Sequence, residues 1–461
     1  MNSNRNIPIP PLFLEKFEKL ISSKEFPAFS ASLDGQPVSG LRVNTLKTSL
    51  EKFVEQSPFQ LGEKVPWCEN AYYLSGSDRP GQHPYHAAGV YYLQDPSAMV
   101  PAQILSPLPT DRVLDLSAAP GGKTTQLAAL MGGNGLLVAN EIKDKRIGHL
   151  IQNVERWGAG NVLITNETPE RLADNFGPYF DRVLVDAPCS GEGMFRKDQG
   201  ARAEWSQDMV EGCAVRQKNI MKIAAKCVRP GGHLLYSTCT FSPEEDEGVI
   251  AEVLKTYPEM EVVDIFSVAG FDQGKPEWIG VDPSISKAIR LFPHKIVGEG
   301  HFACLMRKKD GKEQKKGKDQ WRKPLAKADL LSWRAFCQDV LALEIDEERL
   351  KVVGERLYYQ PEEVPETGTL RVAHHGVWFG NLKKDRFEPS HPLALFLPAK
   401  AFKNTHLLDS TSPQISSYLQ GGILETSSKG WTVVTVDGFP IGWGKGVQGS
   451  LKNHYPKGWM K

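Results

Sequence analysis

Between residues 95 and 308 the chain alternates short apolar runs with longer amphipathic stretches, and this alternation restricts the fold more than any other feature of the sequence. The apolar runs predict strands at 112–117, 135–140, 161–165, 181–186 and 232–238, with two more at 260–265 and 301–307. The amphipathic stretches predict helices at 123–131, 143–156, 207–228 and 243–256. Pro243 followed by four acidic residues is typical of a helix start, where acids face the positive end of the helix dipole. Strands separated by helices pair in parallel through right-handed crossovers, so we expect an α/β fold with a doubly wound sheet at 95–308.

The segments on either side of this region are expected to form smaller domains, because 461 residues exceed what one core ordinarily holds. Residues 1–94 combine a helical pattern with short strand-like runs, which predicts an N-terminal α+β domain. Residues 309–323 carry seven basic and three acidic side chains and predict a solvated linker. After the linker we expect a small α+β domain at 324–390. The last domain, at 391–461, is expected to have short strands, with lysines interleaved with aromatic side chains.

The composition excludes several classes of protein. The 55 basic and 55 acidic side chains give no net charge, which argues against a protein that coats nucleic acid through charge alone. No apolar run approaches the roughly 18–20 residues of a membrane span, and residues 1–8 lack the apolar core of a secretory signal. The seven cysteines include no pair within four positions, so neither a zinc knuckle nor a Cys-x-x-C redox motif is expected. We therefore expect a cytoplasmic protein with reduced thiols, no metal and no membrane contact.

A turn rich in small residues follows the first predicted strand of the sheet. It consists of Ser117, Ala118, Ala119, Pro120, Gly121 and Gly122, and Lys123 begins the next helix. Such a turn lies at the carboxyl edge of a parallel sheet, where small residues let the backbone approach a ligand and the helix offers free N–H groups. Glu141 closes the next strand, at the spacing of the acid that binds a ribose diol. We expect these residues to bind a nucleoside cofactor.

Two other interpretations of this turn have to be weighed. Gly121 and Gly122 can mark a tight turn that binds nothing. Gly122-Lys123-Thr124 also resembles the end of the phosphate loop of nucleoside triphosphatases. However, that loop needs a glycine where this chain has Ser117, and it gives Glu141 no role. A nucleoside cofactor without a triphosphate fits better, and S-adenosylmethionine is the leading candidate.

Two cysteines follow the last two strands of the predicted parallel sheet. Cys189 comes after Asp186-Ala-Pro, and Cys239 comes after Tyr236-Ser-Thr. Neighbouring loops at one sheet edge can bring both thiols and the Asp186 carboxylate around one pocket. Thiolate addition to carbon 6 of a pyrimidine makes carbon 5 nucleophilic enough to take a methyl group, and a carboxyl group at the ring nitrogen stabilises the charge that develops. From the residues alone, either cysteine can be the nucleophile.

Together these motifs resemble a known family, the Sun/nucleolar-protein family of RNA 5-methylcytosine methyltransferases. The resemblance is carried by residues 115–124, 186–193 and 236–239, continues through 290–294 and 298–302, and covers residues 1–308. Residues 442–457 look like the C-terminal module of a bacterial subgroup of the family that acts on small-subunit ribosomal RNA. The resemblance implies a Rossmann-like methyltransferase sheet with an N-terminal RNA-binding domain and a C-terminal module of the PUA type.

The resemblance also implies a role for each motif. Cys239 would be the nucleophile, Cys189 would aid release of the methylated product, and Asp186 would hold the cytosine edge beside the cofactor. The backbone of residues 117–123 and the carboxylate of Glu141 would hold S-adenosylmethionine. An aspartate that the family often carries near the adenine falls on Thr168 here, so a contact at that position would use the hydroxyl or the backbone.

The partner that the resemblance implies is 16S ribosomal RNA or the small ribosomal subunit, and we expect the chain to act as a monomer. Two other classes of protein remain as alternatives, a nucleoside triphosphatase and a non-catalytic RNA-binding protein. The first is opposed by Ser117 and the second by the two intact thiol motifs.

Overall fold

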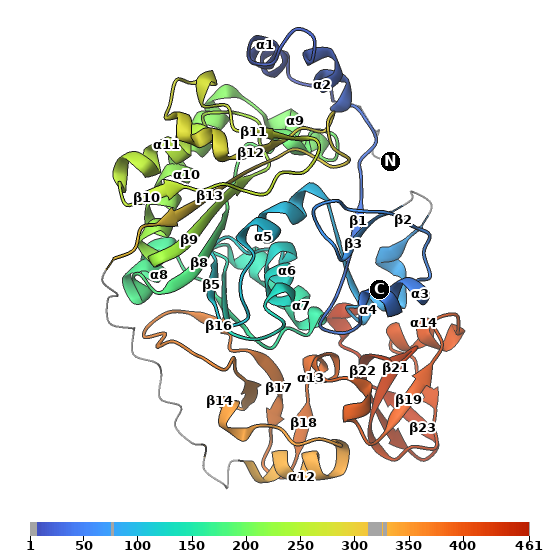
Figure 1. Cartoon of the computed structure of the whole chain (residues 1–461). Coiled ribbons are helices and arrows are strands. Elements are labelled where there is room, and N and C mark those ends of the chain that lie inside the picture. The colour runs from blue at the N-terminus through green and yellow to red at the C-terminus, as the bar shows by residue number, and fades with distance from the viewer. Residues whose placement is uncertain (1–6, 75–77, 312–324, 326–329, 461) are drawn as a thin grey trace.

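A ten-stranded mixed sheet runs through the middle of the protein (Figure 1). The structure is a computed structural model and describes residues 7–74, 78–311, 325 and 330–460. The strands lie in the order β11 (Phe271–Gln273), β12 (Ile289–Leu291), β13 (His301–Lys308), β9 (Val228–Thr238), β8 (Phe180–Asp186), β5 (Arg112–Asp115), β6 (Leu136–Asn140), β7 (Val162–Thr165) and β16 (Val372–His374), while β10 (Met260–Val262) also pairs with β13. The five strands from β9 to β7 are parallel. The expected α/β fold with a doubly wound sheet is therefore confirmed.

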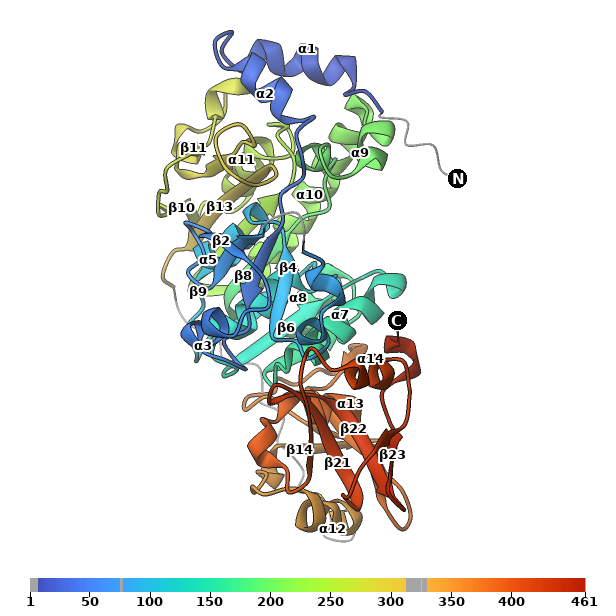
Figure 2. The same ribbon diagram turned by 90° about the vertical axis from the view of Figure 1, so that its right-hand side faces the viewer.

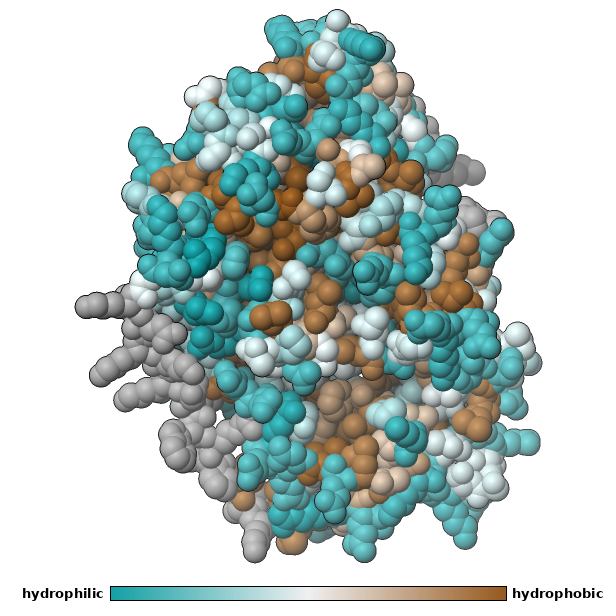
Figure 3. All heavy atoms as spheres, viewed as in Figure 1, coloured by the Kyte–Doolittle hydropathy of each residue, from teal (hydrophilic) through white to brown (hydrophobic). Residues whose placement is uncertain are grey.

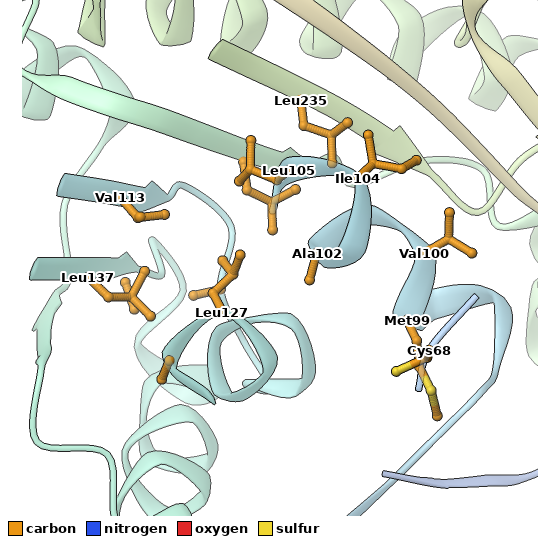
Figure 4. Packing of buried hydrophobic residues seen from close by; sticks show 14 of the residues in the cluster. Cys68, Met99, Val100, Ala102, Ile104, Leu105, Val113, Leu127, Leu137 and Leu235 are labelled. Atoms are coloured by element: carbon orange, nitrogen blue, oxygen red, sulfur yellow. The ribbon is translucent and has the colours of Figure 1, made fainter. Parts of the chain in front are cut away.

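Helices cover both faces of this sheet because successive strand residues point to opposite sides. Val113 joins the core formed with α5 (Val100–Leu105), α6 (Gly122–Leu130) and α7 (Asp144–Trp157), whereas Leu114 joins the core on the other face. Figure 4 shows the first of these cores, with Val113 and Leu137 of the sheet beside Leu127 of α6 and Leu105 of α5. The second face is covered by α8 (Pro169–Phe176), α10 (Gln207–Cys227) and α11 (Glu247–Thr256).

The predicted strands and helices of the sheet are present, but β11, β12 and β16 were not predicted, and β9 begins at Val228 rather than at residue 232. Two helices also differ from the prediction. The helix expected at 243–256 begins only at Glu247, because residues 243–246 form turns. Helix α8 was not predicted, since its eight residues are too short to show a clear helical period.

The N-terminal region packs in two separate places. Helices α1 (Pro11–Leu20) and α2 (Phe26–Ser32) lie at one end of the molecule (Figures 1 and 2). Phe13, Phe17 and Phe29 of these helices share a core with Phe195 and Phe241, which belong to the loops after β8 and β9. The rest of the region is a four-stranded sheet in the order β2-β3-β1-β4. Its elements are β1 (Gly40–Val43), α3 (Leu50–Glu55), β2 (Leu61–Lys64), β3 (Ala71–Leu74), α4 (Pro84–Ala87) and β4 (Tyr91–Gln94).

The C-terminal third occupies the opposite end of the molecule and forms two further sheets (Figure 2). The first comprises β14 (Leu350–Val353), β15 (Arg356–Tyr359), β17 (Val377–Leu382) and β18 (Phe387–Pro389), with α12 (Leu331–Val340) and α13 (His391–Phe396). The second comprises β19 (Thr405–Leu408), β20 (Leu424–Glu425), β21 (Gly430–Val436), β22 (Phe439–Val447) and β23 (Ser450–Asn453), with α14 (Pro413–Leu419). Residues 312–323 of the predicted linker lie outside the described residues.

The N-terminal sheet and the last sheet share one hydrophobic core. Leu41, Val43 and Tyr91 of the former pack in the same cluster as Val434 and Ile441 of the latter. The hydroxyl of Tyr85 also donates to Asp437 Oδ2 at 2.8 Å. The two ends of the chain therefore stabilise each other.

Figure 3 shows hydrophilic side chains spread over one face of the molecule, with hydrophobic patches between them. None of the helices that the structure describes is both long enough and apolar enough to cross a membrane.

Candidate active site

The reversal of strand order beside β5 places the candidate site. From β5 the chain continues to β6 and β7 on one side, and then crosses to β8 and β9 on the other side. Ligands of doubly wound sheets bind at the carboxyl ends of the strands near such a switch point. The loops after β5, β8 and β9, which carry the predicted site residues, meet at this edge.

The turn after β5 packs closely against the N-terminal sheet and the end of β6. Gly121 has a φ of +113°, a conformation that favours glycine, and it directly precedes α6. A Cβ atom on Gly122 would lie 3.3 Å from the side chains of Gln94 and Tyr92. Ala118 N donates to Asn140 O at 2.8 Å, which ties the turn to the end of β6.

A buried arginine supports the turn from the N-terminal sheet. Arg42 Nη2 donates to Gly122 O and to Thr125 Oγ1, both at 2.9 Å. The guanidinium lies over the rings of Tyr92 and Trp157, at 5.6 and 4.8 Å from their centres. The sequence analysis did not identify Arg42 as part of the site, because its role depends on contacts across two domains.

Glu141 lies at the end of β6, as predicted, and is 2% exposed. Its Oε1 accepts a hydrogen bond from Lys143 N at 2.8 Å, whereas its Oε2 accepts none in the described part of the chain and has Arg146 Nη1 at 3.2 Å. Arg146 Nη2 also donates to Ala119 O, so this side chain links the carboxylate to the turn. A buried carboxylate oxygen without a hydrogen-bond donor suits a ribose hydroxyl.

Asn140 organises the same edge and was missed by the sequence analysis. Its amide nitrogen donates to Leu116 O and Glu167 O, and its oxygen accepts from Glu167 N and from the Thr165 hydroxyl. These contacts connect the carboxyl ends of β5, β6 and β7. A polar side chain that ends an apolar strand was the available signal.

Thr168 lies further along this edge, at the start of α8. Its hydroxyl accepts a hydrogen bond from Arg171 N at 3.4 Å, which makes it the N-cap of the helix. The side chain is half-buried. The structure therefore gives Thr168 a structural role as a helix cap.

The two predicted cysteines are in contact. Cys189 Sγ and Cys239 Sγ lie 3.3 Å apart, and all seven cysteines of the chain are free thiols. The backbone of the two loops is also joined, since Gly193 N donates to Cys239 O at 2.8 Å. Cys68, Cys213, Cys227 and Cys304 are buried elsewhere, which is typical of a small hydrophobic side chain, and Cys337 is half-buried.

Asp186 lies beside the thiols and is held by three side chains. Its Oδ2 accepts from Lys123 Nζ at 2.7 Å, its Oδ1 accepts from Ser237 Oγ at 2.8 Å, and His301 Nε2 is 3.9 Å from Oδ1. Ser237 and His301 were not singled out as site residues, although both lie in motifs that carried the family resemblance. The structure thus places Lys123 and Asp186 together, at the edge where the two thiols meet.

Burial and charge set the protonation of this group. Burial opposes a charge on Lys123 and on Asp186, but their mutual attraction outweighs it, raising the pKa of Lys123 and lowering that of Asp186. Burial, reinforced by the Lys123 charge, lowers the pKa of His301 to about 4, so the imidazole is neutral at pH 7. The hydrogen bond with Cys239 and then burial hold the pKa of Cys189 well above its ordinary value.

No cluster of three or more His, Cys, Asp or Glu side chains within the described ranges is arranged to hold a metal ion. The reactive groups at the edge are instead two thiols, a carboxylate and a buried lysine. Rossmann-like methyltransferases are the class of protein that this fold and this edge define.

Comparison with known proteins gives the family within that class. Residues 102–307 match the model described as 16S rRNA methyltransferase RsmB/F. Residues 9–96, 335–397 and 405–461 match the N-terminal domain, the first C-terminal domain and the PUA domain of RsmF. The chain belongs to the ribosomal RNA small subunit methyltransferase F family, a family of 16S rRNA methyltransferases.

Relatives support this assignment over the full length. Ribosomal RNA small subunit methyltransferase F of Vibrio campbellii is 31% identical, covering 98% of both chains. The protein of the same name from Shewanella sp. (strain ANA-3) is 32% identical over 91% of this chain and 90% of its own. A solved methyltransferase homologue from Pyrococcus horikoshii is 28% identical with a TM-score of 0.56, covering 65% of this chain and 100% of its own. The predicted resemblance is therefore confirmed.

Proposed function

We propose that this protein transfers a methyl group from S-adenosylmethionine to carbon 5 of cytidine in 16S ribosomal RNA, through a covalent bond between Cys239 and carbon 6. Membership of a 16S rRNA methyltransferase family supports the reaction class and the kind of substrate. The observation that carries the cytosine chemistry is the contact of two free thiols beside Asp186. A single thiol is enough for the attack, so the second thiol points to a separate role in release of the product.

The attack begins with the Cys239 thiolate, which forms a bond to carbon 6 of the ring. The electron pair of the carbon 5–carbon 6 double bond then moves into the ring and makes carbon 5 nucleophilic. Asp186, which its contacts keep ionised, accepts a hydrogen bond from the amino group at the cytosine edge. The Lys123 cation beside it would offset the negative charge that the attack places on the ring nitrogen. After methylation the proton on carbon 5 leaves to a base, the double bond reforms and the bond from carbon 6 to sulfur breaks.

The surroundings of the two thiols favour Cys239 as the nucleophile. Lys123 is a buried cation whose charge interacts with Cys239. Cys189, in contrast, is held in the thiol form chiefly by its hydrogen bond with Cys239. Once Cys239 is bound to carbon, that restraint is gone and Cys189 ionises more readily. Cys189 is then able to take the proton from carbon 5, which accounts for its role in product release.

The cofactor would be held by the turn after β5 and by the carboxylate that follows β6. The backbone of residues 117–122 and the start of α6 line the cradle, with Lys123 and Asp186 at its inner end. Glu141 Oε2, which has no hydrogen bond in the described residues, would accept from the ribose hydroxyls, and Thr168 would lie on the far side of the cofactor. S-adenosylmethionine supplies the methyl group when it is bound.

Replacing Glu141 by alanine is expected to weaken binding of S-adenosylmethionine. Hydrogen bonds to a charged group contribute roughly 1.5–3 kcal/mol, which corresponds to a loss of about 10- to 100-fold in affinity. Titration calorimetry with S-adenosylmethionine measures the change. Glu170→Ala, an exposed acid in the first turn of α8, is the control. An affinity within twofold of the wild type for Glu141→Ala would remove Glu141 from the site.

The RNA would be bound by the regions at both ends of the chain. We propose that residues 1–94 and 391–461 contact ribosomal RNA on either side of the catalytic domain at 95–308, with 309–323 as a linker and 324–390 as a small α+β domain. A base within an RNA helix must be unstacked before it reaches the thiols, and contacts in the flanking domains offset that cost. We propose further that the protein acts as a cytoplasmic monomer.

Transfer of isotope-labelled methyl groups tests the proposed reaction. The full chain is incubated with labelled S-adenosylmethionine and 16S rRNA, either naked or in assembled small subunits. The labelled nucleoside is identified after digestion of the RNA, and the modified cytidines are mapped by bisulfite sequencing. We expect label at carbon 5 of specific cytidines. Equilibrium dialysis with S-adenosylmethionine and ATP tests the cofactor separately. Label on another atom or base would overturn the cytosine assignment, and binding of ATP alone would overturn the cofactor.

A further inference from the structure

A buried network of hydroxyls and carboxylates lies directly behind the two thiols. Ser190 follows Cys189, Thr240 follows Cys239, and their hydroxyl oxygens lie 2.8 Å apart. The hydroxyl of Ser190 also contacts Glu245 Oε1, and that of Thr240 contacts Glu192 Oε2 at 2.8 Å. All four side chains are 0–2% exposed. Four oxygen atoms therefore form an unbroken chain from Glu245 through Ser190 and Thr240 to Glu192.

The number of protons in this chain can be counted. The four oxygens make three close contacts, and each of these needs one proton between its two atoms. A fourth contact, between Thr240 Oγ1 and Glu245 Oε1, is longer at 3.3 Å and supplies no proton to the contact between the two hydroxyls. The two hydroxyls supply two protons, and an ionised carboxylate supplies none. If both glutamates were ionised, each hydroxyl would donate to its own carboxylate, leaving the two hydroxyl oxygens in contact at 2.8 Å without a proton between them. The geometry therefore needs one more proton, on a carboxyl group.

The N–H groups around the carboxyl groups of Glu192 and Glu245 determine which of the two carries the additional proton. Each oxygen of Glu192 accepts from an N–H group, Oε1 from Trp205 Nε1 and Oε2 from Phe241 N, both at 2.9 Å. Glu245 differs, because its N–H partners, Ser190 N and Gln217 Nε2, both point to Oε2. Glu245 Oε1 meets hydroxyl groups alone in this network and is free to hold a proton.

We propose that Glu245 is protonated in the folded protein, and that its proton completes a chain of hydrogen bonds through Ser190 and Thr240 to ionised Glu192, fixing the two thiol loops in contact. Glu245 and Glu192 are then positioning residues, since neither touches the thiols through the contacts described here. The inference depends on the proposed function only for the roles given to the thiols, because the proton exists whether or not RNA is bound.

The electrostatic surroundings agree with this assignment. Burial, followed by the charge of Glu192, raises the pKa of Glu245 to about 7. Six other titratable or charged groups act on this pair or lie beside it. They are Cys189 in the loop after β8, Cys213 on α10, Tyr236 on β9, Glu244 and Asp246 in the turn before α11, and Arg290 on β12. Glu244 is neutralised by Lys16 at 2.8 Å, and Arg290 is paired with Glu247. No cation in the described ranges forms an ion pair with Glu245 or Glu192.

The pH dependence that follows has a definite sign. Folding raises the pKa of the Glu245 carboxyl group from its ordinary 4.5 to about 7. The contribution of this group to stability is therefore complete below pH 4.5 and is lost as the pH rises through about 7. Stability from Glu245 should thus fall between about pH 4.5 and 7. A glutamine at this position would place an N–H donor toward Ser190 at every pH and its oxygen toward Ser190 N and Gln217.

Two isosteric variants test the proposal without RNA or cofactor. Infrared difference spectra between the wild type and Glu245→Gln at pH 6 should show the carbonyl band of one protonated carboxyl group, and the band should fade toward pH 8.5. In urea unfolding, Glu245→Gln should keep at pH 6 to 8.5 the stability that this site gives the wild type below pH 4.5, and it should lose this part of the pH dependence. Glu192→Gln should raise the unfolding equilibrium constant by on the order of 100-fold, because its amide group would face an N–H donor in either orientation.

The outcomes separate the alternatives clearly. The absence of the carboxyl band from the difference spectrum, or equal destabilisation by the two substitutions, would mean that Glu245 is ionised and that the proposal is wrong. If Glu192→Gln does not fold at all, the band and the pH dependence of Glu245→Gln still decide. A negative result here leaves the covalent cytosine chemistry untouched, and failure of the methyl transfer assay leaves the buried proton untouched.

Discussion

Replacement of Cys239 by serine abolishes both methyl transfer and the covalent bond to RNA, whereas replacement of Cys189 by serine allows the RNA-bound enzyme to accumulate. This is the largest effect that we expect from any single substitution. A hydroxyl group is a far weaker nucleophile than a thiolate, so turnover should fall by at least about 10³-fold in Cys239→Ser. In Cys189→Ser the attack still takes place, but the proton on carbon 5 is removed slowly. A denaturing gel with labelled RNA measures the adduct directly.

A third cysteine provides the matched control for this experiment. Cys337 is a half-buried thiol in α12, in the C-terminal third of the chain, and Cys337→Ser should behave as the wild type in both assays. The opposite pattern, with adduct accumulating in Cys239→Ser and absent from Cys189→Ser, would show that the two roles are exchanged. Adduct formation by neither variant, with methyl transfer retained in both, would exclude covalent catalysis.

Removal of residues 405–461 should destabilise the whole N-terminal sheet as well as remove a domain. The last sheet supplies much of the core in which Leu41, Val43 and Tyr91 are buried. Burial of each large apolar side chain contributes roughly 1.5–3 kcal/mol, and several are lost at once. Because a folded protein has a net stability of only about 5–15 kcal/mol, we expect the truncated chain to lose cooperative unfolding of this region. Thermal unfolding combined with limited proteolysis between residues 40 and 94 measures the effect.

A milder change at the same contact serves as the comparison. Tyr85→Phe removes one hydrogen bond to Asp437 and leaves the shared core intact. Because the acceptor is a carboxylate, the substitution should cost roughly 1.5–3 kcal/mol and leave residues 40–94 protected from protease. A chain ending at residue 404 that unfolds at the temperature of the full chain would show that the two sheets are independent.

The sequence predicted the central sheet well because its signals are local. Each strand is a short apolar run, and the turn at 117–123 and the two cysteines follow strands directly. Once these strands are parallel and adjacent, their carboxyl ends must share one edge, so the proximity of Cys189, Cys239 and Asp186 follows from topology. The meeting of the two sulfur atoms at 3.3 Å is the point where this reasoning and the structure agree most closely.

The parts that sequence reasoning missed depend on contacts between distant segments. The acids at 244–247 were interpreted as a helix start, but Glu245 faces the thiol loops and Glu247 pairs with Arg290 on β12. Of the four, Glu247 is the one in the first turn of α11. Arg42 likewise acts on a turn eighty positions away. No local pattern distinguishes such a buried charged residue from a surface one, because the distinction depends on which segment packs against it.

Strand β16 forms one edge of the catalytic sheet and is synthesised after all the other strands of that sheet. Val372 pairs with Thr165 of β7, so the outer strand comes from beyond the linker, about two hundred positions later in the chain. A strand without a neighbour exposes unpaired N–H and C=O groups and is a template for association with another molecule. During synthesis the ribosome exposes β7 long before residue 372 has been translated. The chain must therefore keep this border of the nascent sheet from pairing with another polypeptide until its own closing strand arrives.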